Sequence, residues 1–178
     1  MTMAAGTKAS GGAIYTVGHS NHTWPKFLDL LVQHHIALVV DTRGQPFSRF
    51  NPQFNRERLK ESLAGCEIDY LWLGDRLSGR PQDPALMGPD GKPDWARVAS
   101  APAFVEGIAQ VASLAEKPAA VLCAEEDPCR CHRRFLLTPP LMDRGLTVLH
   151  IRGDGRIEPE QDIRAREQAR PSQLDLFS

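Results

Sequence analysis

The sequence predicts an α/β fold: a single-domain, three-layer, Rossmann-like sandwich around a mostly parallel five-stranded sheet. Five short runs rich in Val, Ile and Leu lack polar alternation, which is typical of strands buried on both faces. Segments with helical spacing separate these runs, as in a parallel sheet covered by helices. The length of 178 residues, with 42% hydrophobic and 24% charged residues, suits one globular domain and excludes a collagen or a wholly disordered chain.

The strands and helices alternate along the chain. Strands are expected at residues 13–17, 36–41, 68–73, 119–124 and 146–151. The first helix follows Thr23 as N-cap and repeats apolar side chains at helical spacing from Trp24. Pro139 and Pro140 must kink or split the last predicted helix, at residues 132–145. The helices after the first are expected at residues 55–64, 104–115 and 132–145. With right-handed crossovers, we expect strand order 3-2-1-4-5.

The remaining segments define the boundaries of the domain. Residues 1–12 are expected to form a disordered tail, 13–157 the α/β domain, and 158–178 a flexible C-terminal tail. The stretch from 75 to 101 is rich in proline and glycine and predicts a long, functional loop. No apolar run reaches the roughly 20 residues of a membrane span, and the start lacks a secretory signal. With four cysteines read as reduced thiols, we expect a cytoplasmic protein.

Polar or glycine-containing groups follow each predicted strand. The carboxyl ends of parallel strands share one edge of a sheet, where ligands bind in the crevice at a reversal of strand order. The expected order places the group of Gly18, His19 and Ser20 opposite the group that begins at Cys123. We therefore expect one pocket lined by His19, Asp41, Arg43, Cys123, Glu125 and His132.

The segment from Cys123 to Arg134 allows three chemistries. Its cysteines and histidine could bind a metal, but Cys-x5-Cys-x-Cys-His fits no standard zinc pattern, and adjacent Cys131 and His132 rarely reach one ion. Cys123 could be a thiolate nucleophile, although the spacing to the next arginine is one residue longer than in phosphatase loops. In the third interpretation, side chains act as general acid and base.

These alternatives define the catalytic candidates. They are Glu125, His132, Asp41 and Cys123. Arg133, at the start of a predicted helix, is expected to hold an anion. No metal ligand is assigned, and the cofactor is unknown.

A basic, aromatic segment follows the second strand. From Arg43 to Lys60 there are five positive charges and one negative, although the whole chain has a net charge of −1. Three phenylalanines interleave with the arginines, which suits stacked or flipped nucleotides. The alternative is a loop pinned to the core by these phenylalanines. The binding candidates are Gly18, His19, Ser20, Arg43, Arg49, Asn51, Asn55 and Arg133.

The C-terminal pentapeptide reads Gln-Leu-Asp-Leu-Phe, from Gln173 to Phe177. It resembles the peptide by which bacterial polymerases and repair proteins dock on the DNA polymerase sliding clamp. The resemblance implies that the clamp is a partner, contacted by Gln173, Leu174, Leu176 and Phe177. A short helix or strand covering the domain edge is the alternative.

The rest of the chain carries a second resemblance. Its motifs are Tyr15–Asn21, Asp41-x-Arg43, Asn51–Asn55, Tyr70-x-x-Leu-Gly, Cys123-Ala-Glu, Cys131-His-Arg and Gly153-Asp-Gly. Together, over about residues 13–155, they resemble the bacterial family known as domain of unknown function 488. The resemblance implies a compact α/β domain, loosely linked to DNA repair, without a settled reaction. Cys129 and the Pro139-Pro140 pair depart from the family pattern.

These observations together predict a DNA-repair or DNA-metabolism protein recruited by the sliding clamp. Its pocket would bind a nucleotide or DNA phosphate, with hydrolysis, including glycoside hydrolysis, as the candidate reaction. Two alternatives stay open: a non-catalytic DNA-binding adaptor, and a small-molecule enzyme whose tail is incidental.

Overall fold

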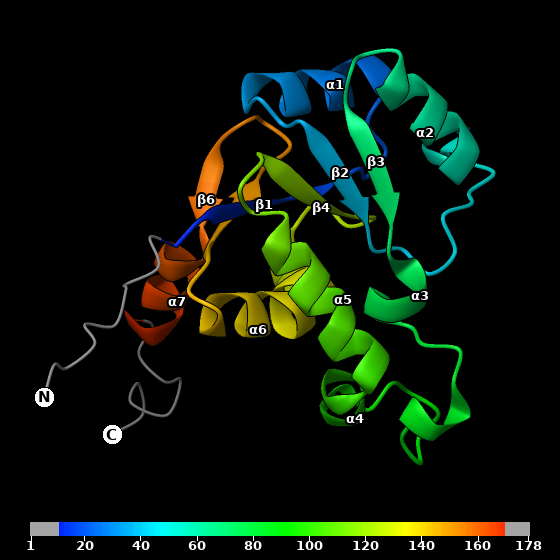
Figure 1. Ribbon diagram of the computed structural model, residues 1–178, viewed down its shortest axis with the longest axis vertical. Helices are drawn as coiled ribbons and strands as arrows, with labels where there is room; N and C mark the ends of the chain where they lie inside the picture. The colour runs from blue at the N-terminus through cyan, green and yellow to red at the C-terminus, as the bar shows by residue number, and fades with distance from the viewer. Residues whose placement is uncertain (1–10, 170–178) are drawn as a thin grey trace, which may run out of the picture.

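The computed structural model describes residues 11–169 (Figure 1). A single six-stranded sheet has the order β3-β2-β4-β1-β5-β6. Five strands are parallel, and β6 runs antiparallel to β5. The strands are β1 (Ala13–Gly18), β2 (Leu38–Asp41), β3 (Asp69–Trp72), β4 (Ala119–Cys123), β5 (Thr147–Ile151) and β6 (Ile157–Pro159).

Helices cover both faces of the sheet, which makes a three-layer α/β domain (Figure 1). On one face, α1 (Trp24–Gln33) and α2 (Arg56–Ala64) bury Phe27 and Leu63. On the other, α5 (Pro102–Ser113) and α6 (Thr138–Asp143) bury Phe104 and Leu141. The remaining helices are α3 (Gly74–Leu77), α4 (Trp95–Ser100), α7 (Glu160–Ala169), the π-helix η4 (Arg133–Leu137) and the short η1 (Pro52–Phe54), η2 (Pro84–Leu86) and η3 (Pro128–Arg130).

The expected strand order was wrong in one respect, because β4, and not β1, lies next to β2. All five residues of β4 are buried, whereas the first and third residues of β1 are partly exposed. The more completely buried strand takes the inner position. The adjacency of β1 and β4, on which the expected pocket depends, is present.

The C-terminal boundary also needs correction, because a sixth strand and α7 extend the domain to residue 169. Apolar residues are sparse in this stretch, but Ile163 is buried. Glu160 accepts hydrogen bonds from Arg134 and Arg164 and contacts His150. The expected flexible tail therefore does not begin at residue 158.

Two predicted irregularities have specific structures. The helix expected over 132–145 is split into η4 and α6, with Pro139 and Pro140 in the first turn of α6, where proline is tolerated. The segment 75–101, expected to be a loop, contains most of α3, all of η2 and α4. Within residues 11–169, no helix is long and apolar enough to cross a membrane.

Candidate active site

A pocket of about 420 Å³ opens at the carboxyl ends of β1, β2 and β4. The chain leaves β1 toward α1 on one face and leaves neighbouring β4 toward η4 and α6 on the other, which opens a crevice between the two strands. Of the residues expected to converge, His19, Arg43, Cys123, Glu125 and His132 line this pocket.

Backbone hydrogen bonds join the ends of β1 and β4. The amide of His19 donates to the carbonyl oxygen of Cys123 (3.0 Å), and that of Ser20 to Ala124 (2.8 Å). A Cβ atom on Gly18 would collide with the carbonyl oxygen of Glu125, so the strands approach this closely only with glycine there. The candidates Gly18 and Ser20 therefore build the edge with their backbones.

His19 presents one ring nitrogen as a hydrogen-bond acceptor. Its Nδ1 lies 2.7 Å from the carbonyl oxygen of Ser20, which can only accept, so Nδ1 carries the proton. The ring stacks on Phe54 with centroids 4.5 Å apart. Burial, together with the nearby Arg43 guanidinium, lowers the pKa of His19 to about 4. At neutral pH His19 is uncharged, and its Nε2 carries a lone pair.

Asp41 lies behind the pocket and holds Arg43. Its buried carboxylate accepts from Arg43 Nε (2.9 Å) and Nη2 (2.6 Å) and from the Tyr70 hydroxyl (2.7 Å). Burial and this carboxylate raise the pKa of Tyr70, which keeps the hydroxyl protonated. Asp41 thus positions Arg43, instead of being the acid–base carboxylate that the sequence predicted.

Arg43 keeps one guanidinium nitrogen available at the pocket. Nη2 also donates to the carbonyl oxygen of Phe54 (2.9 Å). Among the described residues, Nη1 has no hydrogen-bond partner. A rigidly held arginine with a free donor suits a phosphate or carboxylate ligand.

Cys123, Cys131 and His132 form a cluster beside the pocket. The Cys131 thiol donates to Cys123 Sγ (2.7 Å), and His132 Nδ1 lies 3.5 Å from Cys123 Sγ and 3.7 Å from Cys131 Sγ. All four cysteines of the chain are free. The hydrogen bond from Cys131 lowers the pKa of the Cys123 thiol, and the same bond, with burial, raises that of Cys131. Although adjacent cysteine and histidine residues rarely reach one ion, Cys131 Sγ and His132 Nδ1 lie close together here.

Arg133 shapes the loop after β4 and does not enter the pocket. Its fully buried guanidinium donates through Nη1 to the carbonyl oxygen of Glu125 and through Nη2 to that of Glu126 (2.5 Å). Arg133 is therefore a structural arginine, which corrects the expectation of an anion clamp.

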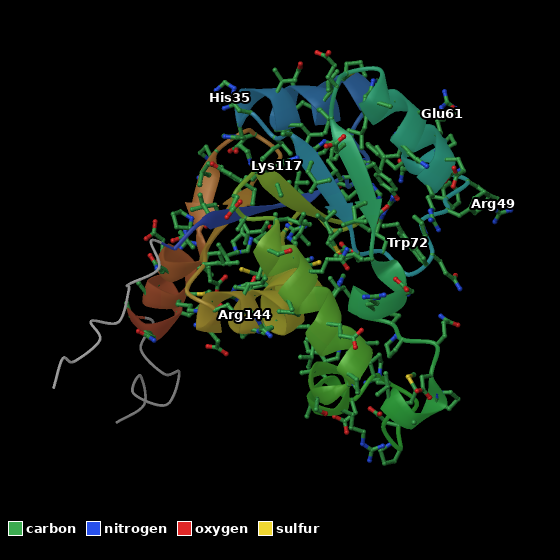
Figure 2. All side chains as sticks on the ribbon, viewed as in Figure 1. His35, Arg49, Glu61, Trp72, Lys117 and Arg144 are labelled. Atoms are coloured by element: carbon green, nitrogen blue, oxygen red, sulfur yellow. The ribbon has the colours of Figure 1, made fainter. Side chains whose placement is uncertain are left out.

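The basic, aromatic segment is partly pinned to the core and partly exposed. Phe54 is buried, whereas Phe47 and Phe50 are 74% and 86% exposed, and Phe47 lines the pocket. Arg49, exposed beside Phe50, lies at the outer edge of the molecule (Figure 2) and does not line the pocket.

The two asparagines expected to bind a ligand, Asn51 and Asn55, form hydrogen bonds within this segment instead. Asn55 Oδ1 accepts from the amide of Ser48 (2.7 Å), and the amide of Asn51 donates to Ser48 Oγ (3.1 Å). Neither asparagine lines the pocket. Their bonds instead fix the curvature of the loop that carries Phe47.

Sequence reasoning missed the contribution of the segment after β3. Ser78, Gly79, Arg80 and Gln82 line the pocket. Arg80 is exposed, and its guanidinium has no ion pair among the residues that the structure describes. The available signal was topological, because this segment also leaves a strand at its carboxyl end.

A known protein family matches about two thirds of the chain. The family described as Domain of unknown function DUF488 matches residues 23–138. The chain belongs to this family. The matched part of the DUF488 chain holds Arg43, Cys123, Glu125 and His132 but begins after His19. No curated protein and no solved structure matches the chain. The predicted clamp-binding peptide at 173–177 lies outside the described residues.

Proposed function

We propose that this DUF488 protein acts in DNA repair or DNA metabolism as a hydrolase whose pocket binds a nucleotide or a DNA phosphate. The observation that carries the proposal is the pocket itself, where a pre-positioned arginine, a neutral histidine and an exposed aromatic ring share one edge of the sheet.

The binding half of the proposal follows from Arg43, Arg80 and Phe47. The free Nη1 of Arg43 and the exposed Arg80 supply charge for a phosphate without breaking an existing ion pair. Phe47, 74% exposed in the pocket wall, offers a face on which a base can stack. A flexible, single-stranded or flipped nucleotide can present base and phosphate to these groups together.

The hydrolytic half follows from His19 and Glu125. Hydrolysis needs a group that takes a proton from the attacking water, and His19 Nε2 has a lone pair for it. Glu125 lines the same pocket and adds a second acid–base group. His132, the other candidate, has Nδ1 turned toward the two thiols, so His19 replaces it in this role.

A binding experiment tests the pocket. Fluorescence anisotropy of a labelled single-stranded oligonucleotide should show salt-sensitive affinity. Phe47→Ala with Arg80→Ala should lower that affinity at least about tenfold, since one base stack contributes about 1–3 kcal/mol. Arg144→Ala, an exposed arginine that does not line the pocket, is the matched control and should leave affinity unchanged.

The outcomes separate the candidate functions. Absence of binding, or equal binding by the double variant, contradicts the proposal. Binding without hydrolysis across a panel of mononucleotides and oligonucleotides indicates the DNA-binding adaptor instead.

Recruitment to the sliding clamp has its own test. Titration of a purified bacterial clamp should give micromolar affinity, about −8 kcal/mol, for the full chain. Leu176→Ala with Phe177→Ala should abolish detectable binding, because truncated apolar anchors cost several kcal/mol. Equal binding by a chain ending at Ser172 would remove the clamp from the proposal.

A further inference from the structure

Two sulfur atoms and one nitrogen atom that could bind a metal lie close together beside the pocket. They are Cys123 Sγ, Cys131 Sγ and His132 Nδ1, all within 4.8 Å of one another. We infer that these side chains form a zinc site with three protein ligands and a fourth position open to the pocket.

Two of the three distances between the ligand atoms agree with a tetrahedral zinc site. Tetrahedral zinc, with Zn–S of about 2.3 Å and Zn–N of about 2.05 Å, separates a sulfur from a nitrogen ligand by about 3.6 Å. The nitrogen lies 3.5 and 3.7 Å from the two sulfurs. The sulfurs are 2.7 Å apart, against about 3.8 Å when both bind one zinc ion, so binding separates them by about 1 Å. Replacing the shared thiol proton by the metal removes the bond that holds them together.

The surroundings favour bound thiolates. The backbone amide of Arg133 donates to Cys131 Sγ (3.5 Å), and its fully buried guanidinium adds positive charge next to the cluster. Such donors stabilise sulfur in its charged form, which is the form that binds zinc. Two thiolates and one Zn²⁺ carry no net charge, which suits this buried place.

The imidazole is held where a ligand has to be. A Cβ atom on Gly79 would lie 2.6 Å from Cβ and Cγ of His132, so the glycine lets the backbone after β3 pack against the ring. His132 Nε2 is buried and has no hydrogen-bond partner among the described residues. Nδ1, the ring nitrogen that lies close to both sulfurs, is the atom that would bind the metal, and the ring proton then lies on Nε2.

The open position faces the pocket. Cys123 and His132 line it, whereas Cys131 does not. Catalytic zinc sites combine three protein ligands with a bound water, and the metal lowers the pKa of that water. Glu125, two residues after Cys123, lines the same space and could accept the proton. This catalytic use rests on the proposed function; the metal site itself does not.

The test measures metal on the full-length protein. Purified under reducing conditions with zinc, the protein should retain one equivalent, read by elemental mass spectrometry. Cobalt substitution should give a thiolate-to-cobalt charge-transfer band and the strong visible absorption of tetrahedral cobalt. Cys123→Ser, Cys131→Ser and His132→Gln should each weaken zinc binding more than about 100-fold, exceeding the usual effect of losing an outer hydrogen-bond partner.

Cys129→Ser is the matched control, because its thiol lies 3.8 Å from Arg134 and outside the cluster. It should retain one equivalent of zinc and the cobalt spectrum. Circular dichroism verifies that each variant is folded. Cobalt without the charge-transfer band, zinc retained by folded Cys123→Ser, or a Cys123–Cys131 disulfide in the reduced preparation overturns the inference. Zinc binding without oligonucleotide binding leaves the metal site standing and refutes only the proposed function.

Discussion

The fold contains two polar clusters that differ in how fully their groups are paired. Around β5, η4 and α7, the Glu160 carboxylate accepts from Arg134 Nε (3.0 Å) and from His150 Nε2 (3.0 Å). A carboxylate only accepts, so His150 Nε2 carries the proton and Nδ1 accepts from the Thr16 hydroxyl (2.7 Å). Beside the pocket, by contrast, His132 Nε2 and Arg43 Nη1 have no partner among the described residues.

This difference separates a cluster that holds the fold together from one that is available to a ligand. Buried polar groups normally find partners, and exceptions need an explanation. In the α7 cluster, pairing joins segments that lack apolar residues of their own. Beside the pocket, Arg43 keeps an unused donor on a side chain that lines the space where a ligand would bind.

The largest expected effect comes from breaking the α7 cluster. Glu160→Ala removes the buried carboxylate shared by Arg134 and His150. Arg134 keeps its ion pair with Glu167, so the variant should cost about 3 kcal/mol of the free energy of unfolding. Chemical denaturation measures it. Arg164→Ala removes an exposed partner of the same carboxylate and should cost less than about 1 kcal/mol. Equal costs would mean that the cluster is not what stabilises α7.

Acid should weaken the same cluster. Contacts with His150 and the arginines lower the pKa of Glu160 from 4.5 to about 2, despite its burial. A carboxyl whose folded pKa is depressed stabilises the fold above its unfolded pKa, and this contribution is lost as pH falls from about 4.5 toward 2. The loss should be on the order of 3 kcal/mol. Denaturation across this range checks it, and Glu160→Gln should flatten the dependence.

Tyr70→Phe tests the hydrogen bond between Tyr70 and Asp41, which lies behind the pocket and helps to hold Arg43. The variant removes one of several hydrogen bonds to Asp41 and leaves both bonds from the Arg43 side chain. We expect a loss of about 1 kcal/mol in the free energy of unfolding and unchanged oligonucleotide affinity. A large loss of affinity would show that Tyr70, too, is needed to position Arg43.

The smallest effect should come from the pocket cluster. In protein treated with a chelator, His132→Ala should change the free energy of unfolding by less than about 1 kcal/mol, because its contacts to sulfur are weak and Nε2 is unpaired. The same denaturation assay applies. A cost equal to that of Glu160→Ala would abolish the distinction between the clusters.

The sequence alone predicted the layers of the fold and the edge that carries the pocket, because periodicity and strand ends determine both. The sequence could not show whether β1 or β4 lies next to β2, since both strands are apolar and their burial differs at only a few side chains. It missed α7 because ion pairs with residues distant in the chain hold this helix, and its own hydropathy is low.

Side-chain roles in the site were harder to predict than the site itself. The sequence predicts that Arg133 holds an anion and that Asp41 is a catalytic carboxylate, because these residue types suit such roles. Arg133 donates to two backbone carbonyls and Asp41 accepts from a neighbouring guanidinium, and only the folded geometry specifies these partners. The need for glycine at position 79 could not be predicted from the sequence, because it depends on the ring of His132 that packs against it in the fold.

The central position of β4 has a consequence for synthesis on the ribosome. β1 and β2 do not pair with each other, since β4 lies between them. The nascent chain therefore carries these two strands with open edges until residues 119–123 have emerged. Sheet closure requires contacts between segments about a hundred residues apart, which slows folding and exposes strand edges to aggregation. We expect the nascent domain to depend on chaperones that shield strand edges until translation has passed β4.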